Sequence, residues 1–503
     1  MRRHHFRAPL RLLIAILVLL VLLVLLGASP AAAALTTASG EPSVSVGELH
    51  YHASAVAYRH DAGDARVEFF IRIPYREVKF LPADNRFEAR VRVTVELTSG
   101  KSRRAGYQQR EARLQSTDAA ATIDSLLGEI YTLGMVAPRG KYHYKITVED
   151  MNVARRGLVY QMKNKKRQGE VQGDIDMSDW LFQNPAVSGI ELAWNVQDRT
   201  AETPFGKGSF EVQPHPSGYY GYFKDMVSAY YEIYDLPPPP GGRSYLVRTM
   251  ILGAQSDTLL ESIDSLRVTE GTAWPHALYA DVGALPSGHY RLRIDLLGDS
   301  DRSLAASQAE FDVLWDADSW RPEASDLYEV TAQALLTQEQ AYAFRQLSRG
   351  EKEAKLADVW RSIDPTPDTA ENELRRDFKA RVAYANAHYS VFERGMFSDR
   401  GRIWIQFGEP DEIQIERLPV SDKTLGVVVE GQIPRTSKDL LTKPDQGVVD
   451  TRPYEIWTYH LRGHELIPRH RMNEISAGMK FVFVDEQGYG EYTLRYSSVS
   501  GVR

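Results

Sequence analysis

The sequence predicts a multidomain protein in which two tandem antiparallel β-sandwich (Ig-like) domains precede an α+β C-terminal domain. Up to residue 316, segments of strand length follow one another and alternate apolar with polar residues. Beyond Trp320 the apolar period lengthens to that of helices, and strands return after Gly395. The 503 residues are too many for one core and suggest about three domains.

The N-terminal segment, residues 1–34, has the order of a secretory signal peptide. Four arginines precede an uncharged apolar run over residues 12–26, and small residues follow up to Ala34. We expect cleavage after Ala33 or Ala34. The alternative is a retained membrane anchor, because about 20 apolar residues can span a bilayer. Both alternatives place the rest of the chain outside the cytoplasm, in the periplasm or at the cell surface.

The charge and the cysteine count exclude several classes of protein. The full chain has a formal net charge of −7, and loss of the four N-terminal arginines makes it −11. An acidic chain is not expected to bind nucleic acid, which requires clustered Lys and Arg. The chain has 0 cysteines. This excludes disulfides, a thiol nucleophile, thiolate metal sites and lipid attachment through an N-terminal cysteine.

The first sandwich is expected over residues 43–184. Its alternating segments are rich in Val, Tyr and Phe, and their spacing suits antiparallel strands. A short helix is expected within residues 117–133. The predicted strands are 47–58, 65–75, 86–98, 102–114 and 141–150.

The second sandwich is expected over residues 189–316, with strands at 227–234, 244–252 and 289–297. It repeats a spacing of the first region, because Pro138, Gly140, Tyr142 and Ile146 recur as Pro286, Gly288, Tyr290 and Ile294. We interpret the repeat as two related sandwiches. The alternative is common turn chemistry that recurs by chance.

The C-terminal domain is expected over residues 325–497, with helices first and a sheet afterwards. Thr337 and Gln340 form a predicted capping box, and helices are expected over 354–363 and from Asp368 or Thr369 to about 392. Gly395 begins a dense segment of turn and strand, G-M-F-S-D-R-G-R-I-W-I-Q-F-G-E-P-D-E. The strands predicted here are 402–407, 413–417, 454–459, 479–485 and 492–496.

Five blocks in this order resemble the GWxTD domain of exported bacterial proteins. They begin at Val359 (V-W-R-S-I-D-P-T-P-D), Arg381 (R-V-A-Y-A-N), Gly395, Tyr454 (Y-E-I-W-T-Y) and Phe481 (F-V-F-V-D-E-Q-G-Y-G-E-Y). The name-giving motif is altered in this chain: Met396 stands where the family has Trp, and Ser398 where it has Thr. The resemblance implies export and β-rich regions ahead of the domain.

Two groups of polar residues are candidates for chemistry. The acids near the start of the long helix predicted from Asp368 or Thr369 could hold a divalent cation or act as a general acid and base. Capping of that helix is the favoured interpretation. Around the altered GWxTD motif, Asp399, Arg400 and Arg402 could take part in catalysis. A polar network that joins the motif turn to the long helix is the favoured interpretation. The catalytic candidates are Asp364, Glu373, Asp399 and Arg402. The binding or structural motif residues are Asp364, Pro365, Asn372, Glu373, Gly395, Ser398, Asp399, Arg400, Gly401, Arg402, Gly408, Pro410 and Trp457.

The sequence predicts a non-enzymatic binding or structural role in the bacterial envelope. A nucleophile elbow, a phosphate-binding loop and a dinucleotide fingerprint are all missing. The spacing of His460, His464 and His470 is similar to that of zinc ligands, but Gly463 and Pro468 prevent one helix through them, and no H-E-x-x-H motif occurs. We therefore expect no cofactor and no metal. The expected partner is another envelope protein or a cell-surface component, with membrane contact only through an uncleaved N-terminus. The alternative is a hydrolase or other enzyme that uses the carboxylates of the C-terminal domain.

Overall fold

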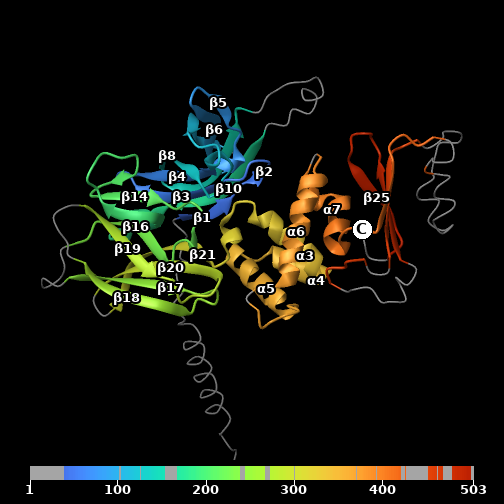
Figure 1. The fold of residues 1–503 in the computed structure, drawn as a ribbon. Coiled ribbons are helices and arrows are strands. Elements are labelled where there is room, and N and C mark those ends of the chain that lie inside the picture. The colour runs from blue at the N-terminus through green and yellow to red at the C-terminus, as the bar shows by residue number, and fades with distance from the viewer. Residues whose placement is uncertain are drawn as a thin grey trace, which may run out of the picture. The chain divides into compact units, whose positions relative to one another are not determined.

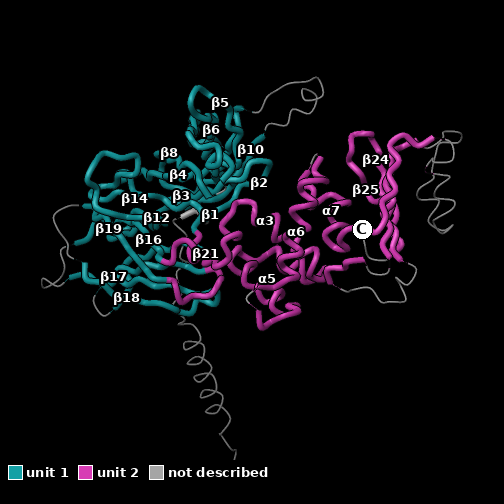
Figure 2. Tube along the Cα trace, viewed as in Figure 1, with its two compact units in different colours: residues 1–218, 226–281, 290–311 teal, residues 219–225, 282–289, 312–503 magenta. Residues whose placement is uncertain are grey.

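The computed structural model describes residues 39–100, 103–124, 126–152, 167–237, 244–266, 272–298, 301–369, 371–391, 393–420, 425, 451–460, 463–467 and 478–499. The predicted signal segment 1–34 lies outside them. Figure 2 shows that the chain forms two compact units. Unit 1 contains residues 1–218, 226–281 and 290–311, and unit 2 contains 219–225, 282–289 and 312–503. Among the described residues, no helix combines the length and apolarity needed to cross a bilayer.

The protein is rich in β-structure, with several antiparallel sheets (Figure 1). The first sheet has the order β1-β3-β4-β8, and the second has β2-β10-β9-β6-β5 with β7 paired to β6. Alternate residues of β6, from Ala89 to Leu97, are fully buried, as its sequence pattern predicts. The strands are β1 Ser39–Val44, β2 Val46–Gly47, β3 His52–Arg59, β4 Asp64–Pro74, β5 Leu81–Ala83, β6 Arg86–Ser99, β7 Arg103–Ser116, β8 Gly128–Pro138, β9 Gly140–Asp150 and β10 Gln168–Met177.

Two further sheets follow along the chain. The third has the order β11-β16-β12-β14-β13 with β19 paired to β16, and the fourth has β15-β21-β20-β17-β18. The short β15 pairs in parallel with the last residues of β21. The strands are β11 Ala186–Val187, β12 Glu191–Asp198, β13 Gly206–Lys207, β14 Phe210–Pro214, β15 Tyr219–Gly221, β16 Met226–Tyr234, β17 Tyr245–Leu252, β18 Thr258–Leu266, β19 Ala273–Asp281, β20 Gly288–Leu297 and β21 Ser303–Leu314.

Unit 1 contains a buried ionic cluster where residues of β3 and β4 pack against residues of the third sheet. The Nζ atom of Lys207 donates to Tyr58 Oη at 3.0 Å, to Glu68 Oε2 at 2.5 Å and to Glu191 Oε2. The side chains of Lys207, Glu68 and Glu191 are 10%, 11% and 1% exposed. Because so little water reaches these charges, they depend on one another for stabilisation.

Unit 2 contains the helices and a final four-stranded antiparallel sheet, β22-β23-β24-β25. The predicted capping box at Thr337 is confirmed, and Ser348 with Glu351 forms a second one. The elements are α3 Ala324–Leu335, α4 Gln338–Arg345, α5 Arg349–Ser362, α6 Glu373–His388, α7 Asp399–Phe407, β22 Glu412–Glu416, β23 Tyr454–Tyr459, β24 Met479–Asp485 and β25 Tyr492–Ser497.

Some predicted elements are wrong. Residues 402–407 form part of helix α7 and not a strand, because Ser398 caps a helix there through the N–H of Gly401. The long helix α6 begins after Asn372, whose side chain accepts from Arg375 N, and ends at His388. In place of the predicted helix within residues 117–133, the described part of this segment contains a 3₁₀ turn, Ala121–Ile123, and the start of β8.

Candidate functional site

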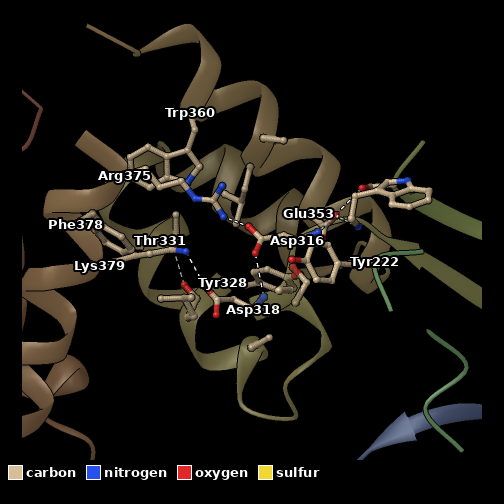
Figure 3. Close-up of a pocket in the computed structure, with 18 residues that line it drawn as sticks. Tyr222, Asp316, Asp318, Tyr328, Thr331, Glu353, Trp360, Arg375, Phe378 and Lys379 are labelled. Atoms are coloured by element: carbon tan, nitrogen blue, oxygen red, sulfur yellow. Dashed lines mark hydrogen bonds and ion pairs between the residues drawn. The ribbon is translucent and has the colours of Figure 1, made fainter. Parts of the chain in front are cut away.

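Unit 2 contains a pocket of about 610 Å³ between the turn after β21 and the helices α3, α5 and α6. Figure 3 shows the residues that line it. The 3₁₀ turn Ala317–Trp320 forms one wall of the pocket. Asp316 caps this turn by accepting a hydrogen bond from Asp318 N at 3.0 Å. The volume lies within the range of pockets that hold small ligands, roughly 300–1,000 Å³.

Acidic side chains of the turn pair with basic side chains of α6 across the pocket (Figure 3). Arg375 forms an ion pair with Asp316, and Lys379 Nζ lies 2.6 Å from Asp318 Oδ2. Burial lowers the pKa of Arg375 from its ordinary value. The two pairs join α6 to the turn and present opposite charges to a ligand.

Glu353 of α5 is the most deeply buried charged residue of the pocket wall, with 7% exposure. Its Oε1 atom accepts from Ser287 Oγ at 2.6 Å, Trp315 N at 2.7 Å and Asp316 N at 3.2 Å. Among the described residues, none donates a hydrogen bond to its Oε2 atom. The Oε1 atom therefore fixes the segments that contain Ser287 and Trp315, whereas the Oε2 atom accepts no hydrogen bond from a described residue.

Aromatic side chains form much of the remaining wall. Trp360 and Phe378 pack with their ring centroids 5.5 Å apart, and Tyr328 donates to Ser319 Oγ at 2.6 Å. Burial raises the pKa of Tyr328 well above its ordinary value, so its hydroxyl keeps its proton. Tyr222, by contrast, is 56% exposed. The pocket thus combines apolar rings with a few placed polar groups, as binding sites do.

The predicted acids near the start of α6 form local hydrogen bonds. Asp364 Oδ1 accepts from Thr366 N at 3.0 Å, and Glu373 Oε2 accepts from Thr366 Oγ1 at 2.5 Å. The second of these hydrogen bonds lowers the pKa of Glu373. Asn372 caps α6 and also donates from Nδ2 to Trp360 O at 2.8 Å. Pro365 lies in the turn between α5 and α6. The cap of α6 is therefore Asn372, and Glu373 lies in its first turn.

The motif residues form a tight corner between α6 and α7. A Cβ atom on Gly395 would lie 1.9 Å from Ala385 O, and one on Gly401 would lie 1.8 Å from Gly395 O. Ser398 donates from Oγ to Gly395 O at 2.7 Å and accepts from Gly401 N at 3.1 Å. Only residues without a Cβ allow the backbone to approach this closely.

Polar side chains of the same corner bind the final sheet. Asp399 forms an ion pair with Arg402, and its Oδ2 accepts from Leu494 N at 2.6 Å. Arg400 lies 2.9 Å from Glu455 Oε1, and its guanidinium stacks near the rings of Tyr389 and Tyr492.

Glu455 extends this polar network, because its other oxygen accepts from the Nε1 atom of the predicted motif residue Trp457 at 3.0 Å. Gly408, with φ +77°, ends α7 two residues before Pro410, and its carbonyl accepts from Tyr459 Oη at 2.9 Å.

The four catalytic candidates do not meet in one site. Glu373 lies at the start of α6, whereas Asp399 follows the corner that packs against Ala385 near its end. The 16 residues of α6 span about 24 Å at 1.5 Å per residue. Asp364 and Glu373 both accept hydrogen bonds from Thr366, and Arg402 forms an ion pair with Asp399. The carboxylates of the two groups therefore cannot act on the same small substrate.

We expect Asp399→Ala to lower the free energy of unfolding by about 1–3 kcal/mol, because the N–H of Leu494 loses its acceptor. Asp358→Ala is the matched control: Asp358 also pairs with an arginine three residues later, but its side chain is 68% exposed. Chemical denaturation of the full chain measures both effects. Equal stability of the two variants would contradict the structural role of Asp399.

The pocket residues Asp316, Asp318 and Glu353 are missing from the sequence-based candidates. They come from a turn and a separate helix, and no spacing along the chain indicates that they converge. The available signal is local: the acid-rich, tryptophan-flanked segment W-D-A-D-S-W over residues 315–320 follows a strand directly. Acids flanked by aromatics at a strand end are a reasonable sign of a pocket wall.

Comparisons with known proteins identify one family. The model of the GWxTD domain matches residues 310–419. This range includes the turn after β21, the helices that line the pocket and the α6–α7 corner. No curated protein matches the chain.

Solved structures with some similarity to the chain are glycosidases. A putative beta-galactosidase from Bacteroides fragilis is 9% identical over 49% of this chain and 32% of its own, with a TM-score of 0.18. A Bifidobacterium dentium beta-glucuronidase is 12% identical over 50% of this chain and 39% of its own, with a TM-score of 0.16. A Bacteroides uniformis beta-glucuronidase is 9% identical over 49% of this chain and 26% of its own, with a TM-score of 0.18. The chain spans less than two fifths of each, and TM-scores this low carry no conclusion about fold or activity.

Proposed function

Because the chain carries a GWxTD domain at residues 310–419, we propose that it is an exported bacterial envelope protein with a non-enzymatic binding role. The order of arginines, apolar run and small residues at the N-terminus supports export. The proposed location is the periplasm or the cell surface. The partner is another envelope protein or a cell-surface component.

The pocket is the observation that carries this proposal. Its two aspartates pair with Arg375 and Lys379, and its glutamate accepts three hydrogen bonds. Charges held in this way give a fixed pattern of donors and acceptors between aromatic walls. Such a pattern recognises a ligand, whereas proton transfer needs an acid or base that is free to change its charge.

We also propose that the β-rich part consists of tandem Ig-like sandwiches that present the GWxTD domain. Residues of the first two sheets, such as Phe69 of β4 and Tyr144 of β9, belong to one buried core. Pro138 and Pro286 each precede a strand, β9 and β20, at the same spacing. These features support two related units in sequence, with the binding site in the domain that follows them.

Photo-crosslinking in bacterial cells tests the binding role. With Tyr222→p-benzoylphenylalanine at the exposed rim of the pocket, we expect a discrete adduct with an envelope protein or surface component. The matched control is the same amino acid at Tyr342, which is 69% exposed on α4 outside the pocket. Absence of an adduct at 222, or the same adduct at both positions, would contradict the proposal. The intact mass of the exported protein distinguishes cleavage from a retained anchor.

A further inference from the structure

The pocket wall carries an excess of negative charge. Its charged residues are the three carboxylates Asp316, Asp318 and Glu353 and the two cations Arg375 and Lys379. Asp316 pairs with Arg375, and Asp318 pairs with Lys379 and also with Arg321 at 3.5 Å. Glu353, on the neighbouring helix α5, is the carboxylate of the wall that these ion pairs do not include.

The two carboxylate oxygens of Glu353 differ in their hydrogen bonds. Its Oε1 atom already accepts from Ser287 Oγ and from the N–H groups of Trp315 and Asp316. Its Oε2 atom is buried, and no described residue donates to it. A buried carboxylate oxygen that has lost its contact with water and accepts no hydrogen bond raises the free energy of the folded protein. A ligand that donates a hydrogen bond to this oxygen would therefore be bound favourably.

We infer that the pocket binds an organic cation, a primary ammonium or a guanidinium group, whose N–H donates to Glu353 Oε2. This inference rests on the proposed binding role and names its ligand class. The cation would neutralise the excess charge of the pocket. The aromatic rings of Tyr222 and Trp315 belong to the same wall, and aromatic rings attract cations that approach their faces.

The same geometry disfavours a metal ion as the occupant. A divalent cation needs several oxygen ligands, and Asp316 and Asp318 are committed to Arg375 and Lys379. Among the residues that the structure describes, no three His, Asp or Glu side chains are placed so that they could hold one metal ion together. A cation with directional N–H groups and an apolar stem fits a pocket of about 610 Å³ with aromatic walls.

Calorimetric titration of the full chain tests the inference. The probes are n-butylamine, which represents a small free amine, and the peptide acetyl-Gly-Lys-Gly-amide, which represents a basic side chain of a partner. We expect at least one of them to bind with one site per chain, and the one that binds identifies the source of the cation. The same peptide with norleucine or Glu in place of Lys should bind at least tenfold more weakly.

Two variants assign the binding to this pocket. Glu353→Gln retains an acceptor for the three existing donors but places an amide where Oε2 was, so we expect Kd to rise at least tenfold. Asp358→Asn removes the same charge from an exposed position on the same helix and should leave Kd unchanged. Tyr222→Ala, at an exposed site, should weaken binding several-fold without affecting folding.

Several outcomes would overturn the inference: no binding of either cation at millimolar concentration, equal binding of the neutral peptide, or an unchanged Kd in a folded Glu353→Gln or Tyr222→Ala protein. A crosslink at Tyr222 combined with any of these results would leave the binding role intact and reject the cation. Cation binding without a crosslinked partner would reject the partner and retain the ligand class.

Discussion

Gly401→Ala should destabilise the GWxTD domain by about 4 kcal/mol or more, a loss seen only for severe substitutions. The added Cβ would lie 1.8 Å from Gly395 O, and Gly395 itself already rests on Ala385 O. Backbone atoms on both sides leave no side chain that could move away, so α7 would have to separate from α6. Chemical denaturation of the full chain, with limited proteolysis to locate the cleavage sites, measures this effect.

Gly63→Ala provides the control for this substitution. Gly63 also has an ordinary φ, but the nearest atom to a Cβ added there would be Asp61 Oδ1 at 3.9 Å, an ordinary contact. We expect a change of less than about 1 kcal/mol there. If Gly401→Ala unfolds at the same denaturant concentration as the control, close packing at the corner does not explain the glycine.

Lys207→Met should lower the free energy of unfolding by about 3–5 kcal/mol, because the buried Glu191 loses its paired cation and Glu68 keeps only its pair with Arg66. Burial raises the pKa of Glu191, and Lys207 opposes that rise. Without Lys207, the Glu191 carboxyl of the folded protein therefore keeps its proton at pH values above the ordinary pKa of Glu, where the same carboxyl of the unfolded protein has lost it. Stability then falls as the pH rises. The loss should therefore be larger at pH 8 than at pH 5.

Two further variants separate this effect from general lysine removal. Lys145→Met breaks a pair with Glu170 in which the two side chains are 40% and 27% exposed, and should cost less than about 1 kcal/mol. Lys207→Met combined with Glu191→Gln removes the charge of Glu191 and should recover part of the stability. A Lys207→Met protein as stable as the Lys145→Met protein, at both pH values, would contradict the buried cluster.

The sequence predicts strands well where one face of a sheet is buried. In β6 the period-two pattern coincides with burial, and the predicted range differs from the observed one by one residue. Short edge strands such as β5 and β13 carry too few residues to show a period. Their position depends on the neighbouring strand, which local sequence does not encode.

Helix α7 shows how a correct observation gives a wrong element. Ile403, Ile405 and Phe407 do alternate, which is typical of a strand. In the structure Trp404 is buried as well, because the helix contacts α6 on one side and the final sheet on another. Asp399, Arg402 and Gln406 are spaced as on one face of a helix, but nine residues contain too few turns for this period to stand out against the alternation.

The motif residues and the pocket differ in how far sequence predicts them. Ser398, Asp399 and Gly401 act within a few residues of one another, so turn chemistry indicates their role. Asp316 and Glu353 meet across 37 positions through a backbone N–H and a carboxylate. Such a contact follows from the packing of α5 against the turn, and neither segment alone reveals it.

The core beside α7 has a consequence for where this domain ends. The family match stops at residue 419, yet Trp404 and Phe407 of α7 pack against Trp457 and Phe481 of the later strands. Arg400 reaches across to Glu455 in the same way. A chain cut at the end of the shared sequence would expose half of a hydrophobic core. The segment that the family shares is therefore shorter than the unit that has to fold.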